Sequence, residues 1–175
     1  MKTYEFKLKF SLPVNESNMD GLVERLGEAG CDDALIGIGQ PGRIALDFLR
    51  EADSAFVAIS SAMADVRSVV PDAKLIEATP DLVGLTDVAD IVGCSRQNIR
   101  KIMVSSVGTF PAPVHEGKSA LWHLSTVLTW LKESRSHQVA DEILEVASIN
   151  MQFNVAKEML AVDKAQRTEI LSLVG

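Results

Sequence analysis

The segment LTDVADIVGCSRQNIRKIM, residues 85–103, carries the clearest structural signal in this chain. Thr86 is a candidate N-cap for a short amphipathic helix, and Gly93 is placed to end that helix because glycine adopts left-handed backbone angles at little cost. Ser95 is a candidate N-cap for a second short helix, whose apolar residues again share one face. The small Ala89 allows the two helix axes to approach closely. Together these features predict a helix-turn-helix.

The polar face of the second helix has the composition of a DNA-reading surface. It consists of Arg96, Gln97, Asn98, Arg100 and Lys101. Arginine and lysine bind guanine edges or phosphates, glutamine and asparagine bind adenine, and Ser95 at the helix N-terminus can bind a phosphate. An ordinary solvated helix surface carries similar residues, but here the turn, the cap and the crossing residue agree, which favours the DNA-binding interpretation. We expect Arg96 and Gln97 to face bases, and Arg100 and Lys101 to face the backbone.

A wing is expected after these two helices. The segment Phe110-Pro111-Ala112-Pro113 cannot be helical, because two prolines one residue apart favour an extended chain. Residues 114–122 then predict a tight β-hairpin with Gly117 in the turn. Lys118, beside that glycine, is a candidate DNA contact on the wing.

A third amphipathic helix is expected from Leu124 to Lys132, with Ser125 as a candidate cap, which completes the order of a winged helix-turn-helix. In these elements the chain resembles the excisionase-like and AlpA-type prophage regulators, distant relatives of the MerR-type winged helices. The segments that carry the resemblance are Leu85–Ala89, Gly93–Gln97, Phe110–Pro113, Trp122–His123 and Val127–Leu131. The resemblance covers about the middle third of the chain and implies DNA binding and control of transcription or recombination. The wing departs from the family, which usually has a more basic one, because here only Lys118 stands beside Glu116.

The charge distribution bears on this interpretation. The chain has a formal net charge of −7, yet within residues 81–135 the basic residues exceed the acidic ones by one. The excess of acid therefore lies outside the predicted DNA-binding region. Because few cations are available for phosphates, affinity per subunit should be low, and we expect a homodimer that doubles the contacts to double-stranded DNA.

Residues 1–80 predict an α+β domain with the element order β-α-β-β-α-β. Alternating apolar residues indicate strands near residues 4–10, 34–38, 43–49 and 74–78. Asn18 and Ser54 are candidate caps of the two helices, and Phe56 and Val57 are expected on the apolar face of the second. This order is that of the ferredoxin-like split motif, a four-stranded antiparallel sheet with two helices on one face.

The segment Gly37–Gly42 formally matches the dinucleotide-binding pattern G-x-G-x-x-G. A dinucleotide site needs those glycines to open a helix, whereas the residues that follow alternate as a strand. We therefore expect a hairpin turn. The alternative is an anion site at Arg43.

No catalytic, cofactor or metal site is expected, and we expect no enzymatic activity. Asp32 and Asp33 are better explained as turn and cap residues than as an acid–base pair. Cys31 and Cys94 lack a metal or redox spacing and are expected to be thiols in a reducing compartment. The histidines, His115, His123 and His137, also lack metal-ligand spacing. The hairpin can bring His115 and His123 face to face, but a pair on a short ribbon is usually structural or solvated. With no signal-peptide pattern and no bilayer-length apolar stretch, a cytoplasmic location is expected.

Residues His137–Leu173 read as helix, with a break near Val162 and Asp163 as the cap of the final helix. This tail either packs onto its own chain or forms a helical dimer surface that sets two recognition helices on neighbouring half-sites. A short linker, Thr79-Pro80-Asp81, should restrict the orientation of the first two domains. The expected domains are residues 1–80 (ferredoxin-like), 81–135 (winged helix-turn-helix) and 136–175 (helical tail).

The function predicted from the sequence is that of a sequence-specific DNA-binding transcriptional regulator. Its N-terminal domain would serve for sensing or assembly, with a small molecule or a protein as the effector. The alternative is a protein-interaction module, an antitoxin or adaptor, whose acidic N-terminal domain binds a protein partner. An enzyme built on the ferredoxin-like domain ranks last, because no residues assemble an active site.

Overall fold

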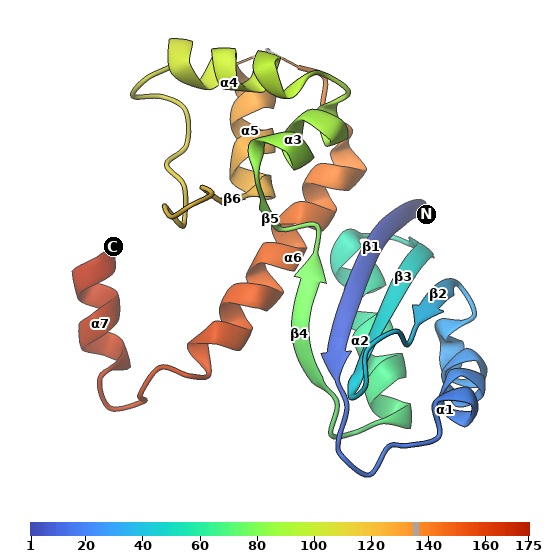
Figure 1. Ribbon diagram of the computed structural model, residues 1–175. Coiled ribbons are helices and arrows are strands. Elements are labelled where there is room, and N and C mark those ends of the chain that lie inside the picture. Colours follow the sequence, from blue (N-terminus) through green and yellow to red (C-terminus); the bar gives the residue numbers. More distant parts are fainter. Residues whose placement is uncertain (135–136) are drawn as a thin grey trace.

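The computed structural model describes residues 1–134 and 137–175, and it has an α+β architecture with an antiparallel sheet (Figure 1). Alternating residues of the N-terminal strands and the inner faces of two helices form one hydrophobic core. The elements of this part are β1 (Lys2–Ser11), α1 (Met19–Leu26), a π-helical turn η1 (Gly27–Cys31), β2 (Ala34–Gly37), β3 (Arg43–Ala52), α2 (Ala55–Val69) and β4 (Lys74–Thr79).

The sheet has the strand order β2-β3-β1-β4, with every neighbouring pair antiparallel. Leu8 in the middle of β1 pairs with Leu46 on β3 and with Ala78 on β4. Tyr4 and Phe48 are buried on the side that α1 and α2 cover, while alternate residues face the other side. β2 and β4 are consequently the edge strands.

Most local predictions for this part are confirmed. Asn18 Oδ1 accepts the Gly21 N–H at 3.0 Å, and Ser54 Oγ accepts the Val57 N–H at 3.2 Å, so both caps are present. The prediction for the apolar face of α2 was wrong at two positions: Phe56 is 57% exposed and Val57 is 48% exposed. The buried stripe of α2 runs instead through Ala55, Ala58, Ile59, Ala62, Met63 and Val66.

Arg50 of β3 points into the helix-covered side of the sheet, where it is held by four partners. Its guanidinium binds both carboxylate oxygens of Asp33, at 2.7 and 3.0 Å, and donates to Asp65 Oδ2 at 2.8 Å. It also donates to Ser61 Oγ and to the Gly30 carbonyl. A buried charge needs such compensation, so this cluster fastens η1, β3 and α2 to one another.

The second part of the chain has its own hydrophobic core, built mainly from short helices. Its elements are β5 (Leu82–Val83), α3 (Leu85–Val92), α4 (Arg96–Ser105), β6 (Trp122–His123) and α5 (Leu124–Glu133). The prediction of Thr86 as the N-cap was wrong. The helix begins at Leu85, and Asp87 Oδ2 accepts the N–H of the preceding Gly84 at 2.9 Å. Thr86 therefore lies inside the first turn.

The predicted wing hairpin is only partly formed. A single β-bridge joins His115 to Leu121, and the strand that follows, β6, pairs with β5 instead of with residues 110–114. Pro111 and Pro113 explain this, because proline has no N–H for a ladder.

The prediction of Ser125 as a helix cap was also wrong. α5 begins at Leu124, with His123 at the cap position. The Ser125 hydroxyl is buried and contacts Met151 Sδ at 3.3 Å. α5 packs against the next helix of the chain, α6 (Asp141–Met159), so Ser125 in the first turn of α5 faces protein and not solvent.

Two helices form the tail, α6 (Asp141–Met159) and α7 (Arg167–Val174). The break near Val162 is confirmed, but the helix begins four residues later than expected. Asp163 accepts the Ala165 N–H in the turn and does not cap α7, which follows Gln166. The predicted domain boundary at residues 135–136 lies outside the described residues. No helix in the described part of the chain has the length and apolar character needed to cross a membrane.

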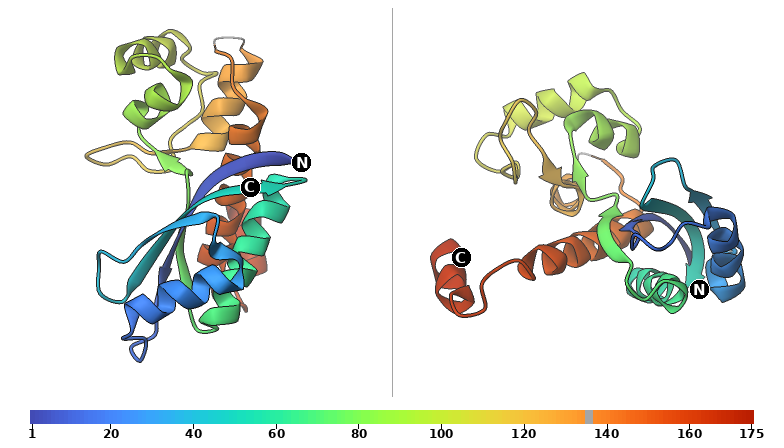
Figure 2. Two further views of the ribbon diagram at one scale, coloured as in Figure 1. Left: turned by 90° about the vertical axis from the view of Figure 1, so that its right-hand side faces the viewer. Right: turned by 60° about the horizontal axis from the view of Figure 1, so that its bottom comes forward.

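The long helix α6 joins the two cores (Figures 1 and 2). Val146 is part of the N-terminal core, with Ile149 and Phe153 packed against it. Ala147, one position further round the helix, is buried in the second core. Of the two alternatives expected for the tail, α6 therefore shows the first: it packs onto its own chain.

The expected linker is half-buried at Thr79 and Pro80 and fully buried at Asp81. Asp81 is 1% exposed and accepts from His123 Nδ1 at 2.7 Å and from Asn154 Nδ2 at 2.7 Å. The Asn154 side chain also bonds the N–H and the carbonyl of Ala78, on β4, as a neighbouring strand would. β4, Asp81, β6 and α6 thus meet in one hydrogen-bond network.

Candidate nucleic-acid interface

Helix α4 is fastened to the second core by one face. Ile99 is fully buried, and Ile102 and Met103 are half-buried against the same cluster. Ala89 on α3, 1% exposed, lies in the same core as Ile99, which lets the two helices approach. Gly93 has φ 70°, the left-handed conformation that ends α3 and turns the chain into α4.

The residues predicted to contact DNA are all exposed. Six of them come from one helix and its cap: Ser95, Arg96, Gln97, Asn98, Arg100 and Lys101. Ser95 Oγ accepts the Asn98 N–H at 3.1 Å, so the predicted cap is confirmed. Among the described residues, no ion pair or side-chain hydrogen bond engages the charged groups of Arg96, Arg100 or Lys101. These three cations are therefore available to a ligand.

The helical repeat distributes these side chains around the solvent face. Successive residues turn by about 100°, which places Gln97 and Lys101 opposite the buried Ile99. Arg96 and Arg100 lie on one flank. The major groove of B-DNA is wide enough to admit an α-helix, so such a face can be presented to base edges.

Val104 belongs to this face and was missed in the sequence analysis. It follows Gln97 by seven positions and Lys101 by three, which is the spacing of one helix face, and it is 60% exposed. An exposed aliphatic side chain among cations can contact the methyl group of thymine. Its signal in the sequence was that spacing, together with its position away from Ile99.

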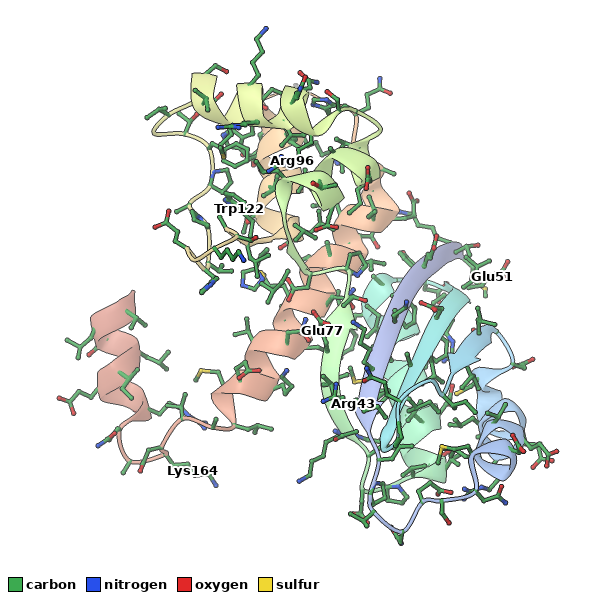
Figure 3. The ribbon with its side chains drawn as sticks, in the orientation of Figure 1. Arg43, Glu51, Glu77, Arg96, Trp122 and Lys164 are labelled. Carbon is green, nitrogen blue, oxygen red and sulfur yellow. The ribbon has the colours of Figure 1, made fainter. Side chains whose placement is uncertain are left out.

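The tail does not cover α4. The helix lies at the outer edge of the molecule, and α6 packs on the far side of α5 (Figure 1). In Figure 3, Arg96 lies in the upper part of the molecule, near α4, whereas Lys164, in the segment before α7, lies at the lower left. Within a single chain the polar face is therefore open.

Lys118 lies on a different segment from the cations of α4. It is exposed, in the loop that leaves α4 and returns to β6, and it precedes β6 by only four residues. The loop is anchored by its aromatic base: Trp122 Nε1 donates to the Pro111 carbonyl at 3.0 Å, and the Phe110 ring packs edge-on against Trp122 and Trp130. The anchored loop thus offers one lysine apart from the helix.

Other candidate sites from the sequence have structural roles. Residues 37–42 form the turn between β2 and β3, in which the Arg43 N–H bonds the Gln40 carbonyl at 3.1 Å, so the hairpin prediction is confirmed. His123 binds Asp81 and does not face His115. The described residues contain no group of three side chains from His, Cys, Asp and Glu placed to hold a metal ion.

Comparisons of the chain with protein-family models, curated proteins and solved structures find no match. A functional assignment must therefore rest on the chemistry of this chain alone. The exposed face of α4 is the surface whose residue types point to a definite kind of ligand.

Proposed function

We propose that this chain is a sequence-specific DNA-binding regulator that reads the major groove with α4. The observation that carries the proposal is the exposed face of α4. This face bears three unpaired cations and two amides, and the helix is buried only on its opposite side, at Ile99. The resemblance of residues 85–131 to excisionase-like and AlpA-type regulators supports the same function. The N-terminal α+β part then serves for sensing or assembly.

Different side chains have different roles in this proposal. Arg96 and Gln97, in the first turn of α4, read base edges, because the N-terminal part of a recognition helix points into the groove. Arg100 and Lys101 bind phosphates, which positions the helix without carrying sequence information. Lys118 adds a separate phosphate contact from the loop before β6.

Chromatin immunoprecipitation with a tagged chain identifies the target, and fluorescence anisotropy over a salt series then measures the contacts. Replacing Arg100 and Lys101 together by alanine should reduce the slope of log K against log salt by about 1.8, two phosphate contacts at about 0.9 each. The matched control is Arg67→Ala with Lys74→Ala, two exposed cations of the N-terminal part. Arg96→Ala should instead cost about 1–3 kcal/mol and relax specificity at one base pair.

Two results would overturn this function. One is the absence of any enriched sequence in the immunoprecipitate. The other is an equal salt slope for the α4 variant and the control variant, because binding would then follow net charge alone.

A second candidate function, a protein-interaction module, is favoured by the face of the sheet that α1 and α2 leave open. Leu35 on β2 and Leu49 on β3 are 75% and 62% exposed on that face, and the register places Leu35 opposite Asp47, beside Leu49. Affinity capture with the chain and with its Leu35→Asp, Leu49→Asp variant tests this candidate. A protein partner lost from the variant, with no DNA retained by either chain, would favour it over DNA binding.

A further inference from the structure

We propose that α7 of one chain docks into a groove of a second chain, so that the protein is a dimer built by reciprocal exchange of this helix. The proposal goes beyond DNA binding and does not depend on it. Two unpartnered apolar surfaces of the same chain carry it: the docking groove, defined below, and α7 itself.

The docking groove lies between β4, the β5–β6 pair and α6, and it has a volume of about 500 Å³. Six of the twelve lining residues are apolar: Ile76, Leu82, Val114, Val155, Met159 and Val162. Three of these, Leu82, Val114 and Val155, are 44–52% exposed. Asp81 and His123, at the inner end, already bond to each other, so the groove offers chiefly apolar contact.

Helix α7 has the complementary character. Its eight residues include none that is buried, and Ile170, Leu171, Leu173 and Val174 are 38–78% exposed. It stands apart from the rest of the chain in Figure 1 and in the right-hand view of Figure 2. A short helix without packed neighbours is marginal in water, so it needs a surface to cover its apolar side chains.

The chain's own groove is not the surface that its α7 meets. The Arg167 guanidinium donates to the Met159 carbonyl at 2.8 Å and to the Val162 carbonyl at 3.5 Å. Asp163 holds the turn between them by accepting the Ala165 N–H. These bonds fix the start of α7 to the end of α6, and no residue of α7 is buried against its own chain.

In a dimer, the α7 of each chain can cover the docking groove of the other, so that both apolar surfaces are buried. Val162 lines the groove and belongs to the connection that leads to α7, so an exchanged helix leaves from the rim of one groove and enters the groove of its partner. The exchange is self-complementary, which closes a two-fold dimer. The charges at the groove do not oppose this exchange, because Glu77 and Glu158 each already pair with a lysine of their own chain, Lys9 and Lys157.

Disulfide trapping between two chains that each carry one introduced cysteine tests the exchange. Both chains carry Cys94→Ser and retain the buried Cys31; one adds Val155→Cys in the groove and the other Leu171→Cys on α7. Mixed and oxidised, they should form a covalent dimer on a non-reducing gel. A control chain with Leu35→Cys in place of Val155→Cys, also at an exposed position, should form much less.

Sedimentation velocity over a concentration series supplies the second readout. The chain should show a monomer–dimer equilibrium, and Leu171→Asp should weaken the dimer by at least about tenfold, because each groove loses a leucine. A chain that remains monomeric at every concentration overturns the proposal. So does a chain carrying both Val155→Cys and Leu171→Cys that forms only an internal disulfide. Either result leaves the salt-slope comparison of α4 variants unaffected, so failure of the exchange and failure of DNA binding are distinguishable.

Discussion

Replacing Asn154 by alanine should test whether the buried junction holds the two cores together. The side chain accepts the Ala78 N–H at 2.9 Å, donates to the Ala78 carbonyl at 2.8 Å, and donates to Asp81 Oδ2 at 2.7 Å. Alanine removes all three bonds. It leaves a backbone amide, a carbonyl and part of a carboxylate unsatisfied in a site that is 9% exposed at Asn154 and 1% exposed at Asp81.

The size of the effect follows from those groups. A buried polar group that loses its partner costs about 1–3 kcal/mol, and the bond to a carboxylate lies at the upper end. We expect Asn154→Ala to lower the free energy of unfolding by about 3 kcal/mol, which for a chain of this length lowers Tm by about 6–12 °C. Gln152→Ala is the matched control, because Gln152 is exposed on the same helix and should change stability by less than about 0.5 kcal/mol.

Two probes in a urea titration separate the cores. Trp122 and Trp130 both belong to the second core, so tryptophan fluorescence reports on that part, whereas far-ultraviolet circular dichroism reports on the whole chain. In the Asn154→Ala variant the two transitions should separate, because the bonds between the cores are lost. Coincident transitions with a loss below about 1 kcal/mol, or a loss equal to that of Gln152→Ala, would refute the role of this junction.

Three further predictions concern the N-terminal part. Arg50→Lys should lower the free energy of unfolding by about 2–3 kcal/mol in urea titrations, since one ammonium cannot replace the forked contacts of a guanidinium; an unchanged midpoint would contradict this. Burial raises the pKa of the Cys31 thiol to about 11, so at pH 8 a thiol reagent should modify Cys94 first and Cys31 only on unfolding, and equal rates would refute the burial. The Tyr4 hydroxyl, and after it Lys2, lowers the pKa of Glu145 in the folded state, so its stabilising effect is present at neutral pH and is lost as the pH falls through that lowered pKa. Glu145→Gln should therefore be slightly less stable than the parent at pH 7 but equal to it at low pH, and a deficit that persists in acid would argue against the pairing.

Features encoded by neighbouring residues could be predicted from the sequence. The caps at Asn18, Ser54 and Ser95 and the turn at Gly93 depend on groups within a few positions of one another. The exposure of the α4 face followed from the spacing of its apolar residues, because a short helix buries only the side that carries them. These features place the candidate DNA-binding residues without any knowledge of distant contacts.

The errors arose where a distant contact competed with a local signal. Ser125 has the residue type of a cap, but α5 packs against α6 and the hydroxyl is buried against Met151. The error at Thr86 had a local cause instead: the chain uses Gly84 as the cap residue, which has no side chain to indicate it, and Asp87 accepts the Gly84 N–H. Phe56 was expected on the buried apolar face of α2, but it is exposed and its ring stacks on Phe153 of α6, with ring centroids 6.3 Å apart.

By itself the sequence determined the α+β class, the strand alternation around β1 and the identity of the polar face on α4. Only the tertiary structure decided that Asn154 would bind Ala78, 76 positions away, and that Asp81 of the expected linker would be buried. It also decided that α7 would bury none of its residues. The physical reason is range. Helix periodicity, strand alternation and caps depend on residues within a few positions of one another, whereas burial and partner choice depend on which distant segments exclude water together.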